Sequence, residues 1–197
     1  MKKTLVASLG VILVAMVLAA CGGGLRFSER AEDARGFHPK GIVVLPVDAG
    51  AYGQAKDEAN AVLAQILSEK RWFDRILAGK EMADRLAADE TFRKAVTDYT
   101  NKLQTVNFSD PALSQAIGKA AQAEALLTAT IESWFYTKEK DKKIAKVGFA
   151  VQVIEAETGK TMWRAAHHLD ESYTLFQPSL TDVARKLVHQ ILNDMPH

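Results

Sequence analysis

The chain has 197 residues, with 25 lysines and arginines against 24 aspartates and glutamates, and its formal net charge is +1. This balance excludes the basic excess that is typical of nucleic-acid-binding domains and the acidic excess of proteins that store cations. The only cysteine lies near the N-terminus, so an internal disulfide is excluded and the core alone must stabilise the fold.

Residues 1–20 have the three parts of a secretory signal peptide. Lys2 and Lys3 give a positive start, an apolar run extends from Leu5 to Leu18, and small residues precede Cys21. The run is shorter than the roughly 20 residues that a transmembrane helix needs. A retained membrane-spanning anchor is therefore the weaker alternative.

The end of this segment, Leu18-Ala19-Ala20-Cys21, resembles the bacterial lipobox. The resemblance implies cleavage between Ala20 and Cys21, a lipid on the cysteine sulfur, and a membrane anchor of several acyl chains. An ordinary signal peptide with a chance cysteine is the alternative. Gly22 follows where lipoproteins of the enteric type retained at the inner membrane have Asp. This implies an outer-membrane anchor that faces the periplasm.

The chain after the cysteine divides into a linker and a domain. Residues 21–40 are rich in glycine and then charged, without a sustained hydrophobic period, which predicts a lipidated cysteine followed by a flexible tether. At about 3.4 Å per residue this tether would keep the domain near its membrane. Residues 41–197 have the length of a single domain.

The first half of the domain alternates between strand and helix patterns. Residues 41–47 form a continuous apolar run that is typical of a strand buried on both faces. Apolar residues spaced three and four apart predict a helix over 54–69, and a short strand follows at 72–77. From 79 to 108 the pattern is helical with two separate apolar stripes, which we interpret as a helical insertion.

The second half begins with a helix that Asp110 caps and that extends to about residue 123. Three strands follow at 125–138, 144–155 and 161–169, and the short loops between them predict an antiparallel meander.

An unbroken apolar stripe from Leu180 to Leu192, with Ser179 as its cap, predicts the last helix. The elements together predict an α/β fold: a mixed sheet with a C-terminal antiparallel meander of three strands, packed by amphipathic helices.

Three segments, 42–47, 116–134 and 151–165, resemble a known superfamily. Its members are the curli-secretion lipoproteins of the CsgG type, the penicillin-binding-protein activators of the LpoB type and the TolB N-terminal domain. Their motif at the last strand pair is matched here by Thr158, Gly159 and Trp163. The resemblance implies a TolB N-terminal/CsgG-like fold.

We interpret the motif as structural, with Thr158 and Gly159 in a tight turn and Trp163 packed back onto the sheet. Residues 79–108 depart from the superfamily pattern. The charged loop from Lys138 to Lys143 differs from the long amphipathic strands with which curli-type channels enter a membrane, which argues against a pore.

The sequence contains few candidates for catalytic, metal-binding or cofactor-binding residues. The sequence has no phosphate-binding loop, no metal-ligand spacing and no nucleophile motif, so we expect no cofactor and no metal. His167 and His168 are neighbours on a strand and point to opposite faces, so they are not expected to chelate one metal. The adjacent acids at 57–58, 89–90 and 170–171 are interpreted as solvated charges.

The aromatic run Trp134-Phe135-Tyr136 is the candidate contact surface. Neighbouring residues of a strand alternate faces, so one side is expected in the core and the other forms a rim or a docking surface. Trp134 and Tyr136 are the candidates for docking.

These observations predict a non-enzymatic lipoprotein of the outer membrane that faces the periplasm. It would act as an assembly or secretion accessory by binding another envelope protein or further copies of itself, and it would not bind nucleic acid. The alternative is an activator of a peptidoglycan synthase, and an envelope hydrolase is a third possibility. Residues 79–108 are expected to capture the partner and to be dispensable for folding.

Overall fold

The apolar run that opens the domain is strand β2 (Gly41–Val44) in the computed structural model, which describes residues 26–197. Ile42 and Val44 contribute to one hydrophobic core and Val43 to another. The predicted strand with two buried faces is therefore confirmed.

The other elements are β1 (Phe27–Arg30), η1 (Glu32–Gly36), η2 (Gly50–Ala55), α2 (Lys56–Lys70), β3 (Arg75–Leu77), α3 (Gly79–Ala88), α4 (Glu90–Val106), α5 (Pro111–Ala121), β4 (Ala125–Glu139), β5 (Lys142–Glu155), β6 (Thr161–Tyr173) and α6 (Leu180–Leu192).

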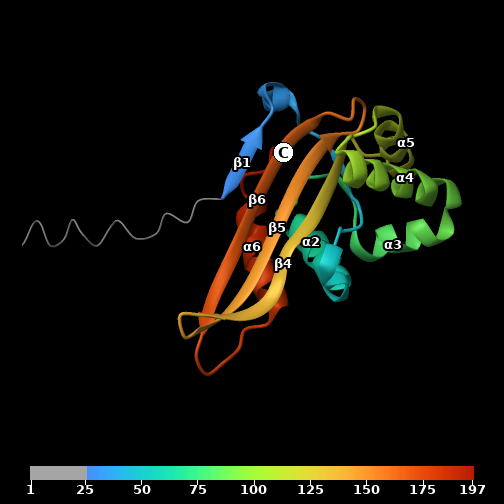
Figure 1. Cartoon of the computed structure of the whole chain (residues 1–197). Helices are drawn as coiled ribbons and strands as arrows, with labels where there is room; N and C mark the ends of the chain where they lie inside the picture. Colours follow the sequence, from blue (N-terminus) through green and yellow to red (C-terminus); the bar gives the residue numbers. More distant parts are fainter. Residues whose placement is uncertain (1–25) are drawn as a thin grey trace, which may run out of the picture.

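The strands form one 6-stranded sheet in the order β1-β6-β5-β4-β2-β3. β4, β5 and β6 are the predicted antiparallel meander, and β2 pairs in parallel with both β3 and β4. The sheet is thus mixed, and the α/β fold class is confirmed. In Figure 1 the long strands of the meander run from the helical end of the molecule to a pair of loops at the opposite end.

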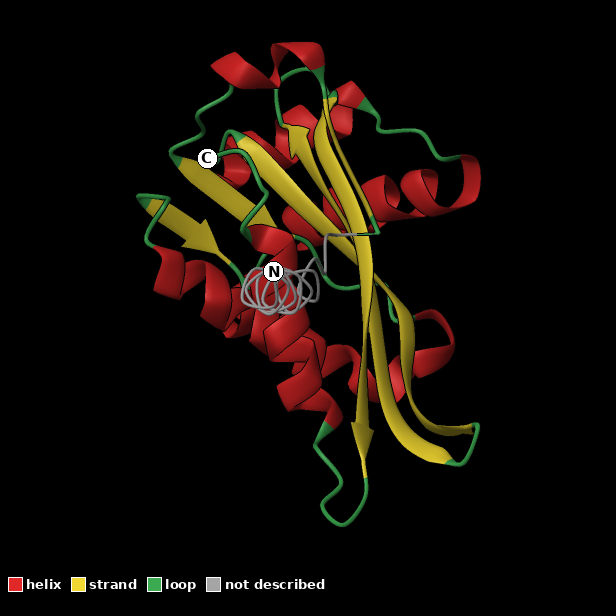
Figure 2. Ribbon diagram, turned by 90° about the vertical axis from the view of Figure 1, so that its left-hand side faces the viewer, coloured by secondary structure: helices red, strands yellow, loops and turns green. Residues whose placement is uncertain are grey.

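Helices cover the two faces of the sheet unequally. α6 packs on one face along β5 and β6, α2 packs beside α6, and their apolar residues contribute to the first core. On the other face α3, α4 and α5 cover only the end near β2, where they make a second core. Figure 2 shows helices on both sides of the sheet and the long strands extending past them.

Each of the last two helices starts at a residue that the sequence marks as a cap. The Asp110 carboxylate accepts from the backbone N–H groups of Ala112 and Leu113, and Ser179 accepts from the N–H of Asp182. These side chains satisfy donors that a helix leaves unpaired at its first turn.

The flexible tether predicted over 21–40 is wrong from Phe27 onward. Residues 27–30 form β1, which pairs antiparallel with β6, and Ala34 and Phe37 are buried in the first core. β6 would otherwise present an unpaired edge, and a polar strand such as β1 covers it without needing apolar residues. The predicted signal peptide and the lipidation of Cys21 lie outside the described residues.

Residues 79–108 do not form a separable insertion. Phe92, Val96 and Tyr99 of α4 are buried against Val43 and Leu126 of the sheet. The segment therefore closes the second core, which argues against the expectation that it is dispensable for folding. From Arg26 onward, no helix has both the length and the apolar character needed to cross a bilayer.

Candidate interaction surface

One face of the meander has no helix over its middle, and we call it the open sheet face. It is the side of β4, β5 and β6 opposite α6, and it lies towards the viewer in Figure 1. Ala129, Val151 and Ala165 point into the first core, so their neighbours along the strands point the other way. The residues of the open sheet face are Thr128, Thr130, Lys146, Gly148, Ala150, Gln152, Arg164, Ala166, His168 and Asp170.

The middle of the open sheet face carries small side chains. Thr130, Ala150 and Ala166 lie side by side on three neighbouring strands, and Phe27 of β1 continues the row. Gly148 lies in the next row, where an added Cβ would meet the Ser133 hydroxyl at 2.7 Å. The space above Gly148 is thus filled by the domain's own side chains, and the Arg26 guanidinium reaches Glu132, beside Gly148, at 2.8 Å. The exposed Thr130 and the half-buried Ala150 leave the next row more open.

α4 forms a wall beside this face. A hollow of about 290 Å³ separates Leu103, Gln104 and Asn107 of α4 from Thr130 and its neighbours on the sheet. Val106 and Phe108 at the end of α4 are 66% and 52% exposed, and Phe27 on the far side is 40% exposed. Apolar side chains therefore flank a polar floor on two sides.

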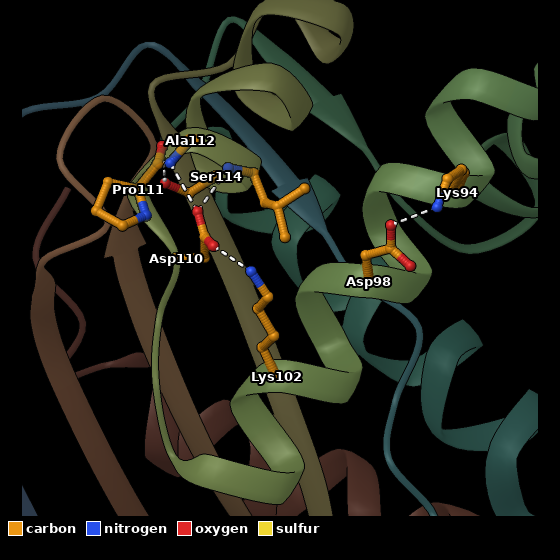
Figure 3. A network of polar contacts seen from close by, with 8 residues as sticks. Lys94, Asp98, Lys102, Asp110, Pro111, Ala112 and Ser114 are labelled. Carbon is orange, nitrogen blue, oxygen red and sulfur yellow. Dashed lines mark hydrogen bonds and ion pairs between the residues drawn. The ribbon is translucent and has the colours of Figure 1, made fainter.

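Polar contacts hold α4 against α5 (Figure 3). Lys102 Nζ donates to the Asp110 carboxylate at 2.5 Å, and the same carboxylate caps α5. Ser114 Oγ donates to the Ala156 carbonyl at 2.9 Å, which ties α5 to the end of β5. The wall beside the open sheet face is thus fixed to the sheet rather than loosely attached.

The pKa values of Asp110 and Tyr99, where α4 meets α5, are shifted in opposite directions. The hydrogen bond from Lys102, followed by backbone N–H donors at Leu113 and Ala112, lowers the pKa of Asp110. Burial raises the pKa of Tyr99, whose hydroxyl lies 2.8 Å from Ser109 Oγ. Both shifts are explained by helix packing and capping.

The predicted turn motif lies at the end of the sheet that α5 covers. Gly159 has φ of +71°, and an added Cβ there would lie 3.1 Å from the Pro111 Cα. Thr158 Oγ1 accepts from the N–H of Lys160. Trp163 is fully buried, and its Nε1 donates to Ser28 Oγ at 3.1 Å. The motif residues therefore shape a turn and hold β1.

The structure separates the two predicted docking residues. Trp134 is 6% exposed and packs edge-on against Phe149, so its assignment as a docking residue is wrong. A bulge between Ile131 and Ser133 adds one residue to β4, and this extra residue shifts the alternation so that Trp134 points into the core. Tyr136 is 40% exposed, and its hydroxyl donates to the Pro178 carbonyl at 2.8 Å.

His167 and His168 do not form a metal site with other ligands. Their ring centroids are 5.9 Å apart, and His167 Nδ1 accepts from the backbone N–H of Arg26 at 3.2 Å. Burial, followed by the charges of His168 and Arg26, lowers the pKa of His167. Within residues 26–197, no three His, Cys, Asp or Glu side chains gather closely enough to hold a metal ion.

The adjacent acids at 89–90 and 170–171 belong to caps and ion pairs. Asp89 caps α4 and accepts from Arg85 at 2.9 Å. Asp170 pairs with Lys146 at 3.1 Å, and Glu171 pairs with Lys186 at 2.9 Å. These roles match the interpretation of the acids as surface charges.

A second hollow, of about 660 Å³, lies at the helical end between the 37–40 loop and α5. Lys40, Lys119, Glu155 and Glu157 give it charges of both signs. The Glu124 carboxylate there accepts from the N–H of Gly41 at 2.7 Å, so it positions β2. The open sheet face is the better candidate, because exposed apolar side chains flank it.

Comparison with known proteins finds matches to this chain among solved structures. No family model matches it, and no curated protein matches its sequence. The PelC dodecamer from Paraburkholderia phytofirmans matches with a TM-score of 0.52 and 16% identity, over 80% of this chain and 89% of the other. The lipoprotein GNA1162 from Neisseria meningitidis matches with a TM-score of 0.51 and 17% identity, over 78% and 98%.

The hypothetical protein CT253 from Chlamydia trachomatis also matches, with a TM-score of 0.50 and 14% identity over 78% of this chain and 93% of the other. At these identities the likeness shows a shared fold. The fold is thus one that a bacterial lipoprotein has, while membership of the superfamily with CsgG and LpoB stays a prediction.

Proposed function

We propose that this chain is a lipid-anchored protein of the cell envelope that acts by binding protein, first of all further copies of itself, through the open sheet face. The assembled copies would serve as a non-enzymatic assembly or secretion accessory for another envelope protein. The anchor would be the acylated Cys21, in the outer membrane and facing the periplasm.

The open sheet face carries this proposal. Thr130 and Ala150 give it small side chains at the surface, and Phe27, Val106 and Phe108 supply apolar contacts at its sides. Large apolar side chains that stay exposed at one surface of a folded domain are typical of sites that bind other proteins. The PelC structure with the same fold is a dodecamer, which supports self-association here.

The short connection to the anchor supports a role close to the membrane. Six peptide steps separate Cys21 from Phe27, the first residue of β1, and they span at most about 20 Å. An activator that reaches a distant peptidoglycan synthase needs a longer connection. Stimulation of purified synthases by the mature protein would nevertheless favour that alternative.

Native mass spectrometry of the mature protein in mild detergent tests both parts of the proposal. We expect a subunit mass that exceeds the polypeptide from Cys21 by its acyl groups, and we expect oligomers. Thr130→Arg places a long charged side chain at an exposed position of the open sheet face and should give monomers. Ala87→Arg on the exposed side of α3 is the control and should leave the oligomers intact.

Two results would contradict the proposal. A polypeptide mass without acyl groups would remove the anchor. Wild-type protein that stays monomeric at all concentrations, or Thr130→Arg oligomers equal to those of the control, would remove the assigned interface.

A further inference from the structure

Two loops meet at the end of the molecule farthest from α3, α4 and α5, and we call them together the distal tip. They are the β4–β5 hairpin at residues 138–143 and the β6–α6 loop at residues 174–178. Lys143 pairs with Tyr173 across the strands, and both loops border one shallow depression. Figure 2 shows them side by side at the bottom of the molecule.

The distal tip presents two apolar side chains to solvent. Leu175 and Phe176 are 87% and 89% exposed, more than any other large apolar residue among residues 26–197. The loop that carries them is held at its base, because Tyr136 donates to the Pro178 carbonyl and packs edge-on against Tyr173. Burying such a pair in an apolar medium is favourable, so the loop is suited to insertion.

The neighbouring hairpin is basic. It contains Lys138, Lys140, Lys142 and Lys143 against Glu139 and Asp141. Asp141 pairs with Lys138 at 2.9 Å, and Glu139 lies 4.0 Å from Lys146. Within the part of the chain that the structure describes, the other three lysines of the hairpin have no ion-pair partner. Their charge is available to an anionic surface.

We propose that the distal tip binds the surface of an anionic bilayer, with Leu175 and Phe176 in the interface and the hairpin lysines against the lipid headgroups. Apolar residues beside clustered lysines are the combination with which peripheral proteins bind such membranes. A protein partner would satisfy the apolar pair equally well, but the excess of lysines beside it favours lipid phosphates.

The direction of β1 brings the anchor to the same end. β1 runs antiparallel to β6, with Phe27 opposite Ala166, so the N-terminal end of β1 faces the distal tip. From Ala166 to Tyr173 the strand covers about 23 Å at ~3.3 Å per residue. The six steps back to Cys21 reach about 20 Å. This part of the argument rests on the proposed function, because it takes Cys21 to be acylated.

Fully extended, the connection ends about 3 Å short of the level of Tyr173. The glyceryl linkage between the Cys21 sulfur and its acyl chains is long enough to cover this gap, so that one bilayer can hold both the acyl chains and the distal tip. A single weak membrane contact is reversible, whereas two contacts on one rigid domain also fix its orientation. With its strands directed at the membrane, the domain would hold α3, α4 and α5 away from the lipid.

The acylated full chain in vesicles allows a site-specific test, since Cys21 is its only cysteine and carries the lipid. Phe176→Cys then creates a single thiol for a dye whose emission reports water exposure. In vesicles of phosphatidylglycerol and phosphatidylcholine we expect a blue shift and quenching by lipid-borne quenchers. Glu157→Cys, exposed in the β5–β6 turn at the opposite end of the same strands, is the matched control and should show neither.

Charge reversal at Lys140 and Lys142 should abolish the blue shift at position 176, as should vesicles of phosphatidylcholine alone. Chains that float with the vesicles while the dye at 176 stays in water would overturn the tip proposal and leave the anchor intact. Chains that fail to float would instead refute the anchor. A blue shift that arises in detergent on self-association, without vesicles, would assign the tip to a protein contact and also overturn the proposal.

Discussion

Lys102 Nζ on α4 lies 2.5 Å from the carboxylate of Asp110, which caps α5. One carboxylate thus joins two helices: it accepts from the lysine of the first and from the opening N–H groups of the second. The ion pair with Lys102 requires the ionised form of Asp110, so the joint between the helices depends on pH.

We predict that Asp110→Asn lowers stability at neutral pH and loses its effect in acid. The pKa of Asp110 is lowered in the fold, so the contribution of this carboxylate is fully present above its unfolded value of 3.8 and is lost as pH falls through the folded value. Asparagine still caps helices well, so the difference reports the charge. Urea denaturation of both proteins at neutral pH and at about pH 3 measures it.

Asp98→Asn is the control for that experiment. Asp98 pairs with Lys94 on the exposed side of α4, where ion pairs contribute little. A stability gap between wild type and Asp110→Asn that persists undiminished at low pH would show that the charge is not its cause.

Phe92→Ala should destabilise the protein by about 3–5 kcal/mol, because Phe92 is 2% exposed in the second core and its loss leaves a cavity. Lys94→Ala, two residues further along the same helix, should change stability by less than about 0.5 kcal/mol. Chemical denaturation of each variant measures both changes in stability.

Deletion of residues 79–108 should prevent folding altogether. A cooperative unfolding transition in the deletion variant would restore the interpretation of a dispensable insertion.

Gly159→Ala should lower stability by about 1–2 kcal/mol, since the residue has φ of +71° and an added Cβ would press on Pro111. Gly36→Ala is the matched control, because no atom lies within 4 Å of its added Cβ and its φ is not in the left-handed region. It should be neutral or slightly stabilising. Equal thermal midpoints for the two variants would contradict the role assigned to the turn.

Trp163→Phe should loosen β1 more than the rest of the sheet. The substitution removes the Nε1 donor to Ser28 Oγ but keeps most of the apolar volume in the core. Hydrogen exchange should become faster at the amides of residues 28–30 than in β5. Uniform acceleration over both strands would indicate general destabilisation instead.

Much of the fold follows from local patterns. The β-branched run at 41–44, the cap at Asp110 and the stripe of α6 each correspond to an observed element, because each pattern is complete within a few residues. β1 is different. Its sequence Phe27-Ser28-Glu29-Arg30 is polar, and it becomes a strand because β6 presents an edge that the local sequence does not reveal.

The candidate surface depends more on tertiary structure. The bulge that turns Trp134 inward has a faint signal, the consecutive polar residues Glu132 and Ser133 within an alternating strand. The open sheet face results from helices that stop short of the strands, which no local pattern encodes. Leu175 and Phe176 read as ordinary loop residues until their exposure is known.

The pairing of β1 with β6 also has a mechanical consequence. The connection to Cys21 joins β1 at its N-terminal end, so a pull on that end along the strand axis loads the β1–β6 hydrogen bonds in shear, all at once. A sideways pull would unzip the same bonds one after another at much lower force. β1 therefore resists separation from β6 best when the pulling force on the connection to Cys21 is parallel to the strands.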